Sequence, residues 1–486
     1  MLVRMQLTVP ARQVRSVVAA VRRPSGMWWL VGLAAVFTIA QLAFVVAPRM
    51  GLGWDEVVYV SQVSGHAPAA YFDSTRPRGL TLLVAPVELV TASFTALRVY
   101  LSVASGLGLL LALCAWRRLR PDWLLTLAGV LFSGLWVAQF NGPQAMPDFW
   151  TALSALAAVG CFLRFTGGQA AGRGWGALAG LAAAVAWAAL IRPGDAVYLA
   201  APLALAAPVA RRWEPLAATV SGLVAGSAEW VIEAEARFGG LRSRLHLAGV
   251  QQGGFGLHFS LDAEWHALNG PLMCRPGWCT APVRDVPPGL WWLALPALVL
   301  AGLLAARRAG YLCSSLLAVV CAISLAAEYV FMIDDASARY LLPAYALLAI
   351  PAADGLGALV TGTPRKLRPA GVALLGALLA GQLVSQHLIL EREVAGAVAS
   401  TDDYWHVEGD LRALGVRPPC LLNGQQYLPI AYYMGCSSNG FVNHPAPRLR
   451  VALLVWPGDQ PPPFATRWHA YHLHNAGVLS YLVYLP

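Results

Sequence analysis

The chain carries little charge for its length. Charged residues make up 12% of its 486 residues, whereas 58% are hydrophobic. A soluble domain carries about twice that fraction of charge. Lys366 is the only lysine among the 34 basic residues. This composition excludes a large soluble protein and favours a membrane protein.

Two further features are missing. The chain has no glycine-rich phosphate-binding loop between a strand and a helix. It also has no apparent cleavable signal peptide, because the first apolar run, 27–47, is too long for one and is typical of a signal anchor. The net charge of +9 comes from short arginine clusters between apolar runs. We therefore do not interpret it as a nucleic-acid-binding surface.

Apolar runs of about 20 residues, each long enough to cross a bilayer, recur along the chain. They predict an α-helical polytopic membrane protein with about eleven spans. The predicted spans are 27–47, 95–116, 123–141, 149–165, 175–191, 195–210, 215–233, 290–306, 311–331, 341–359 and 370–389.

The arginine clusters give the predicted orientation. Basic residues concentrate in cytoplasmic loops, and the clusters fall in alternate connections between the predicted spans. These clusters are Arg117-Arg118-Leu119-Arg120, Arg164 with Arg173, Arg211-Arg212, Arg307-Arg308 and Arg365-Lys366-Leu367-Arg368. We therefore expect a multi-pass protein of a bacterial plasma membrane with residues 1–26 in the cytoplasm. The long loops 48–94 and 234–289 and the C-terminal residues 390–486 would then lie outside, with a transmembrane domain at 27–389.

The C-terminal region 390–486 mixes a charged helical stretch with short β-rich runs separated by turn residues, which predicts a small α/β domain. Four of the cysteines fall in predicted outer segments, as the pairs Cys274/Cys279 and Cys420/Cys436. An oxidising compartment favours a disulfide in each pair. The alternatives are free thiols or a zinc site, but the spacing of the pairs lacks the usual pattern of metal ligands.

Two adjacent carboxylates, Asp55 and Glu56, follow the first predicted span on the outer side. A carboxylate at this depth can accept a proton from an attacking hydroxyl group. The alternative is that the acids are solvated or cap a short helix. Further along the same loop, Arg76 and Arg78 lie on the predicted outer side, whereas basic residues of membrane proteins usually lie on the cytoplasmic side. Guanidinium groups bind phosphate through paired hydrogen bonds, although both arginines could instead contact lipid headgroups.

Other candidates occur where spans meet the outer face. Asp148 opens the fourth span, either as a favourable residue at a helix N-terminus or as a ligand of an acceptor or divalent cation. Arg192 ends one span and can pair with Asp195 at the start of the next. Arg339 and Tyr340 precede a later span, where they suit a phosphate or, alternatively, the lipid interface.

Together these motifs resemble the GT-C superfamily of membrane glycosyltransferases. The resemblance is to its dolichyl-phosphate-mannose mannosyltransferase-like and aminoarabinose-transferase-like branch. It rests on the order of five motifs across residues 27–359. They are Trp54-Asp55-Glu56, Arg76-Pro77-Arg78-Gly79, Met146-Pro147-Asp148, Arg192-Pro193 and Arg339-Tyr340-Leu341-Leu342-Pro343. One motif departs from the family, since many relatives have a His-Pro-Pro-type motif with lysine where this chain has Arg76-Pro77-Arg78.

The resemblance implies inverting transfer of a sugar from a polyprenyl-phosphate donor to a cell-envelope glycan, lipid or protein acceptor at the outer membrane face. It implies that Asp55 is the general base, with Glu56 as its neighbour or substitute. Asp148 would hold the acceptor or a divalent cation, and Arg339 and Tyr340 would contact the donor phosphate. No cofactor is certain.

The alternative is a non-catalytic GT-C-like protein or a transporter of a lipid-linked sugar. A transporter needs polar residues near the middle of its spans. In this chain the ionisable residues gather at the predicted outer ends, with Glu229 and Glu233 as the main exceptions. This distribution favours the enzyme.

Overall fold

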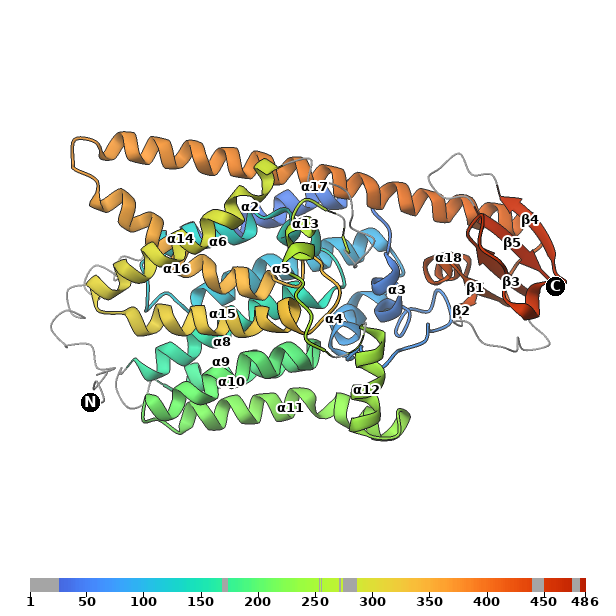
Figure 1. Ribbon diagram of the computed structural model, residues 1–486, viewed down its shortest axis with the longest axis horizontal. Helices are drawn as coiled ribbons and strands as arrows, with labels where there is room; N and C mark the ends of the chain where they lie inside the picture. The colour runs from blue at the N-terminus through green and yellow to red at the C-terminus, as the bar shows by residue number, and fades with distance from the viewer. Residues whose placement is uncertain are drawn as a thin grey trace. The chain divides into compact units, whose positions relative to one another are not determined.

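A computed structural model describes residues 26–167, 174–252, 254, 256–270, 272–273, 286–438, 450–473 and 481–486. The described chain is mostly helical (Figure 1). The helical elements up to residue 209 are α2 (Met27–Gln41), η2 (Leu42–Val46), α3 (Trp54–Val60), α4 (Gly79–Glu88), α5 (Phe94–Cys114), α6 (Asp122–Ser133), α7 (Trp136–Asn141), α8 (Pro147–Thr166), α9 (Trp175–Ile191) and α10 (Pro193–Val209). The later ones are α11 (Glu214–Arg237), α12 (Leu241–Gln251), α13 (Leu261–Ala267), α14 (Val286–Ala309), α15 (Leu312–Phe331), α16 (Leu342–Gly362), α17 (Arg368–Ala413), α18 (Tyr427–Met434) and η3 (Pro463–Ala465).

Each predicted span corresponds to a helix or to a pair of helices. Eight helices within the described residues are long and apolar enough to cross a membrane. The other three predicted spans correspond to shorter apolar helices. One of these predictions, 123–141, is divided between α6 and α7, because the chain between them is not helical at Gly134 and Leu135. The protein is therefore a multi-pass α-helical membrane protein.

The described chain divides into two compact units. The first, which we call the helical unit, comprises the described residues within Met1–Gln41, Val103–Gly142 and Pro147–Leu390. The second, which we call the mixed unit, comprises Leu42–Ser102, Pro143–Met146 and Glu391–Pro486. The mixed unit thus combines the first long loop with the C-terminal region, an association that the sequence did not predict.

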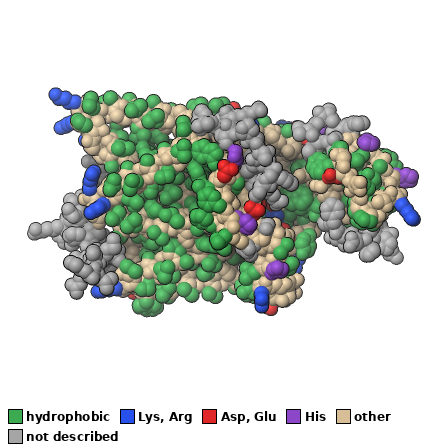
Figure 2. Space-filling model, viewed as in Figure 1, with side chains coloured by type: hydrophobic (Ala, Val, Ile, Leu, Met, Phe, Trp, Pro, Cys, Tyr) green, Lys and Arg blue, Asp and Glu red, His purple; other side chains and the backbone are tan. Residues whose placement is uncertain are grey.

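The helical unit is packed around α8 and α16, which are the most buried of its candidate spans. Small residues let helices approach closely in a membrane protein. At Gly302 in α14, for example, an added Cβ would overlap the backbone oxygen of Pro351 in α16. Hydrophobic side chains cover most of the visible face of the helices (Figure 2), as expected for a surface in contact with lipid acyl chains.

The C-terminal part of the mixed unit is a small α/β domain, as predicted. Its strands are β1 (Cys420–Gly424), β2 (Ser437–Ser438), β3 (Arg450–Val455), β4 (His469–Leu473) and β5 (Tyr481–Leu485). They form one sheet in the order β2-β1-β3-β5-β4. The pairs that β1 makes with β2 and β3 are parallel, whereas β5 is antiparallel to β3 and β4. Helix α18 makes the crossover between β1 and β2.

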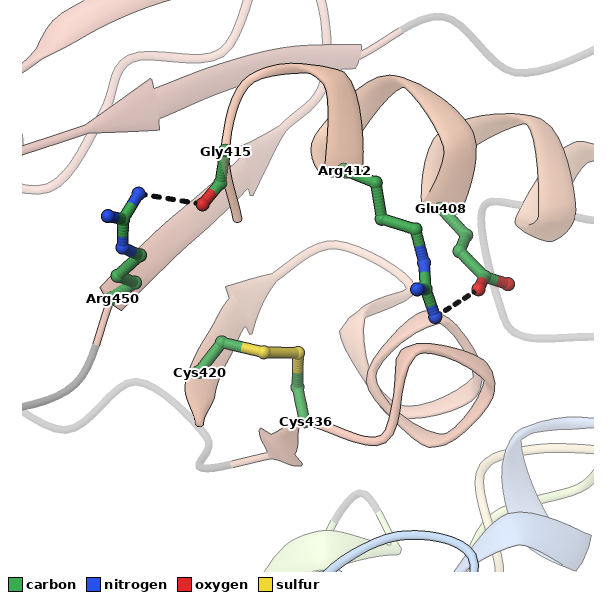
Figure 3. The surroundings of a disulfide bond; sticks show 6 residues. All are labelled: Glu408, Arg412, Gly415, Cys420, Cys436 and Arg450. Atoms are coloured by element: carbon green, nitrogen blue, oxygen red, sulfur yellow. Dashed lines mark hydrogen bonds and ion pairs between the residues drawn. A yellow bond between two sulfur atoms is a disulfide. The ribbon is translucent and has the colours of Figure 1, made fainter. Parts of the chain in front are cut away.

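The predicted disulfide between Cys420 and Cys436 is confirmed (Figure 3). Cys420 begins β1 and Cys436 follows α18, so the bond ties the two ends of the β1–α18–β2 crossover together. Both cysteines belong to the hydrophobic core of the domain. The other predicted pair, Cys274 and Cys279, lies outside the described residues.

Candidate active site

In the mixed unit, α3 carries the two adjacent acids in its first turn. Gly53 precedes the helix, and its backbone N–H donates to Glu56 Oε2 at 3.1 Å. This arrangement is half of a capping box. Acidic side chains in a first turn also interact favourably with the helix dipole. The sequence Gly-Trp-Asp-Glu therefore starts a helix here.

Glu56 is buried and fully engaged by other groups of the protein. It accepts hydrogen bonds from Arg98 Nη1 at 2.5 Å and Nη2 at 2.7 Å. It also accepts one from the backbone N–H of Ala145 at 2.9 Å. With only 3% of its surface exposed, Glu56 has the environment of a structural carboxylate.

Arg98 was not predicted as a site residue. It lies in α5, is 1% exposed, and also donates to the backbone oxygens of Gly51 and Pro143. Its position inside an apolar run was the one signal in the sequence, because a buried charge requires a partner. The sequence could not indicate that this partner is Glu56.

Asp55 has a different environment. Its side chain is 28% exposed, and Arg76 Nη2 donates to its Oδ1 at 2.7 Å. Arg76 also donates through Nε to Asp73 Oδ2 at 2.8 Å. Burial opposes the charged form of Arg76, but the carboxylates of Asp55 and Asp73 raise its pKa well above the ordinary value. Asp55 is therefore an accessible carboxylate held by a permanently charged guanidinium group.

The other residues of this loop fix Arg76 in place. Asp73 accepts hydrogen bonds from the backbone N–H of Thr75 at 3.0 Å and from its hydroxyl at 2.5 Å. The Arg76 guanidinium lies 5.2 Å from the centre of the Tyr59 ring. Arg78, the second predicted arginine, lies 4.4 Å from the centre of the Phe72 ring. The structure thus brings Arg76 to Asp55, and it gives Arg78 an aromatic neighbour.

The helical unit contains a second polar cluster, which is centred on Asp148 in the first turn of α8. Arg192 Nη1 donates to Asp148 Oδ1. Arg339 Nε lies 3.3 Å from Asp148 Oδ2. The predicted pair between Arg192 and Asp195 is also present, with Nε 3.7 Å from Oδ1. One buried carboxylate thus gathers two arginines that are distant from it in the sequence.

Two stacked tyrosines complete this cluster. The rings of Tyr329 and Tyr340 stack with their centres 4.8 Å apart, and the Tyr329 hydroxyl donates to Asp195 Oδ1 at 2.5 Å. The guanidinium groups of Arg192 and Arg339 lie 5.2 and 5.4 Å from the centre of the Tyr340 ring. Burial raises the pKa of Tyr340 to about 12, so its hydroxyl is protonated at neutral pH. Tyr329 was not predicted as a member of this cluster.

A divalent cation at Asp148 remains a prediction. The Asp148 carboxylate is engaged by two guanidinium groups, and the described residues contain no group of three or more His, Cys, Asp or Glu side chains arranged to hold a metal ion. Because two guanidinium groups engage the Asp148 carboxylate, we derive no step through a cation.

No protein-family profile matches the chain, and no curated protein sequence matches it. Solved structures do match. ArnT from Cupriavidus metallidurans in the apo state gives a TM-score of 0.63 at 14% identity, covering 94% of this chain and 97% of that chain. The same protein bound to undecaprenyl phosphate gives 0.59 at 15% identity with the same coverage. The oligosaccharyltransferase of Archaeoglobus fulgidus in the apo form gives 0.52 at 12% identity, covering 85% of this chain and 64% of that chain.

The chain has the GT-C fold. The resemblance drawn from the order of the five motifs is thus confirmed at the level of the fold. ArnT is an aminoarabinose transferase of the GT-C superfamily. The match to it extends over nearly the whole of both chains, so the GT-C fold of this protein includes its C-terminal region.

Proposed function

We propose that this protein is an inverting glycosyltransferase that moves a sugar from a polyprenyl-phosphate donor to a cell-envelope glycan, lipid or protein acceptor at the outer membrane face. The observation that carries the proposal is the contrast between the two adjacent acids of α3. Asp55 is accessible and held by Arg76, whereas Glu56 is buried against Arg98. Of these two acids, Asp55 is the one whose carboxylate is exposed to a substrate.

In the proposed reaction, the oxygen of an acceptor hydroxyl attacks the anomeric carbon of the donor sugar. Asp55 takes the hydroxyl proton as the new carbon–oxygen bond forms. The bond between the anomeric carbon and the phosphate oxygen breaks, and polyprenyl phosphate leaves with the electron pair. Attack from the side opposite the leaving group inverts the anomeric centre. Arg76 keeps the carboxylate of Asp55 in position through its hydrogen bond to Oδ1.

We assign the donor phosphate to the cluster around Asp148. The chemistry of Arg192, Arg339 and Tyr340 supports this assignment, because guanidinium groups and a protonated phenol all donate hydrogen bonds to phosphate oxygens. The match to ArnT bound to undecaprenyl phosphate makes a sugar linked to a polyprenyl phosphate the natural first donor to test. Asp148 would orient the two arginines. Arg78 is a further candidate for donor binding from the first loop.

A transfer assay tests the proposal. The purified protein is reconstituted in proteoliposomes with a panel of polyprenyl-phosphate sugars and candidate acceptors. We expect transfer by the wild type and a loss of about two to four orders of magnitude in Asp55→Asn, the usual cost of losing a general base. Asp459→Asn is the matched control, because Asp459 is exposed in the C-terminal domain.

Two results would contradict the proposal. The first is equal transfer by Asp55→Asn and the wild type. The second is efficient transfer from a nucleotide sugar with no lipid donor present. If the protein moves a lipid-linked sugar across the vesicle membrane without transferring it, the alternative function as a transporter is favoured instead.

A further inference from the structure

Two residues just before α3, Gly51 and Leu52, are held by side chains that come from distant parts of the mixed unit. The backbone N–H of Gly51 donates to Thr401 Oγ1 at 3.1 Å. The backbone N–H of Leu52 donates to the Tyr433 hydroxyl oxygen at 2.7 Å. The same hydroxyl donates in turn to the backbone oxygen of Leu52 at 3.3 Å. On the carbonyl side, Arg98 Nη2 donates to the Gly51 oxygen at 2.5 Å. This short segment therefore depends on side chains for its backbone hydrogen bonds.

Glycine at position 51 permits this close approach. An added Cβ would overlap the Tyr433 hydroxyl and would lie within 2.6 Å of Thr401 Cγ2. Any larger residue would force the Tyr433 and Thr401 side chains away from the backbone that they bind. The residue type at position 51 thus fits the two side chains that contact it.

Tyr433 is itself fixed by its surroundings. It is 6% exposed, and the rings of Phe94, Tyr404 and Trp405 lie 5.4 to 6.2 Å from its own. Burial raises the pKa of its hydroxyl well above the ordinary value, so the group keeps the proton that it donates. Tyr433 lies three residues before Cys436, and the disulfide between Cys436 and Cys420 anchors the end of α18. A well-packed tyrosine on an anchored helix makes a rigid support.

The other end of α18 also contacts α3. Tyr427 begins α18, Trp54 begins α3, and their rings meet edge to face with centres 5.1 Å apart. Trp54 is the residue directly before Asp55. The C-terminal domain therefore contacts the start of α3 through an aromatic pair as well as through two hydrogen-bonding side chains.

We propose that Tyr433 and Thr401 are positioning residues, which hold the backbone of residues 51–54 so that Asp55 is placed for proton transfer. The proposal rests on the proposed role of Asp55. It gives the C-terminal domain a direct part in the reaction without any contact with substrate. A displacement of about 1 Å at a reacting group can lower a rate about 100-fold, so the loss of either hydrogen bond is expected to be visible in kcat.

The test uses two conservative variants of the full-length protein. Tyr433→Phe removes the hydroxyl and keeps the ring, and Thr401→Val removes Oγ1 and keeps the shape. Tyr481→Phe is the matched control, since Tyr481 is also buried in the core of the C-terminal domain but its hydroxyl has no hydrogen-bond partner among the described residues. Amide hydrogen exchange of residues 51–54, kcat, donor KM and the unfolding temperature are measured for each.

We expect faster exchange at residues 51–54 in Tyr433→Phe and Thr401→Val, with kcat lowered about tenfold or more. The donor KM should stay close to the wild-type value. The unfolding temperature should fall slightly, because a buried backbone N–H loses its acceptor, and Tyr481→Phe should match the wild type throughout. A purely structural role would lower the unfolding temperature but leave kcat per folded molecule unchanged.

The proposal is overturned if exchange at residues 51–54 is unchanged in both variants, or if exchange rises while kcat does not fall. It is also overturned if Tyr481→Phe shows the same changes. If the wild type transfers no sugar from any donor, the proposed function fails. The exchange measurement then still decides whether Tyr433 and Thr401 hold the segment, because it requires no activity.

Discussion

The ion pair between Arg98 and Glu56 offers the sharpest test of whether Glu56 has a structural role while Asp55 has the catalytic one. Both side chains are almost completely buried, and two hydrogen bonds join them. Arg98→Met leaves the Glu56 carboxylate buried, and the backbone N–H groups of Gly53 and Ala145 are then its remaining hydrogen-bond donors among the described residues. Removing one member of a buried ion pair costs about 3–5 kcal/mol, because the remaining charge is uncompensated.

The second half of this test is a double variant. Arg98→Met with Glu56→Gln removes both charges, and replacing a whole buried pair by neutral groups is often close to neutral for stability. We therefore expect the double variant to be more stable than Arg98→Met alone, as measured by thermal unfolding in detergent. Its transfer activity per folded molecule should exceed that of Asp55→Asn, because Asp55 remains, but should fall below the wild type, because the hydrogen bond from Arg98 to the Gly51 oxygen is lost.

Two outcomes would refute this reasoning. If Arg98→Met unfolds at the wild-type temperature, the pair does not stabilise the mixed unit. If the double variant is well folded but as inactive as Asp55→Asn, Glu56 takes part in the chemistry. Glu56→Asp is a useful additional variant, since it keeps the charge but shortens the reach to Arg98.

Three further predictions follow from other parts of the chain. Ala309→Cys should resist a membrane-impermeant thiol reagent in intact cells while Gln460→Cys reacts, and the reverse labelling would contradict the predicted orientation. Replacing Cys420 and Cys436 by serine should lower the free energy of unfolding of the C-terminal domain by about 3 kcal/mol, the entropic contribution expected for a closed loop of about 15 residues. Thermal unfolding with and without reductant measures this difference. Equal stability of the serine variant and the disulfide-bonded protein would contradict the prediction. Arg339→Ala should raise the donor KM strongly in the transfer assay, whereas Arg308→Ala, in a predicted cytoplasmic loop, should leave it unchanged; equal effects of the two would remove Arg339 from the donor site.

The sequence by itself determined the fold class. A helix is the one open-ended structure that satisfies its own backbone hydrogen bonds in lipid, so each long apolar run had to be helical. The span 175–191, for example, coincides with α9. The span 123–141 was less accurate, because hydropathy does not register a break such as the one between α6 and α7. The C-terminal α/β domain was also predictable, since its β-rich runs and turns are local features.

The sequence predicted several residues of the candidate site, but it did not predict most of the ion pairs that they form with one another. Asp55, Asp148 and Arg339 could be selected because each is an ionisable residue beside an apolar run. Nothing local distinguished Asp55 from Glu56, which are neighbours on the same helical turn. The difference comes from Arg98, 42 residues away from Glu56, which buries one acid and leaves the other exposed.

The support of the Asp55 segment by the C-terminal domain was decided entirely by tertiary structure. Tyr433 and Leu52 are 381 residues apart, and a tyrosine in an apolar helix has no feature that marks it as a partner for a distant backbone N–H. Periodicity and composition act over one helix or strand, so they fix the elements. Hydrogen bonds and ion pairs between elements depend on how the chain returns to itself, and only the folded structure contains that information.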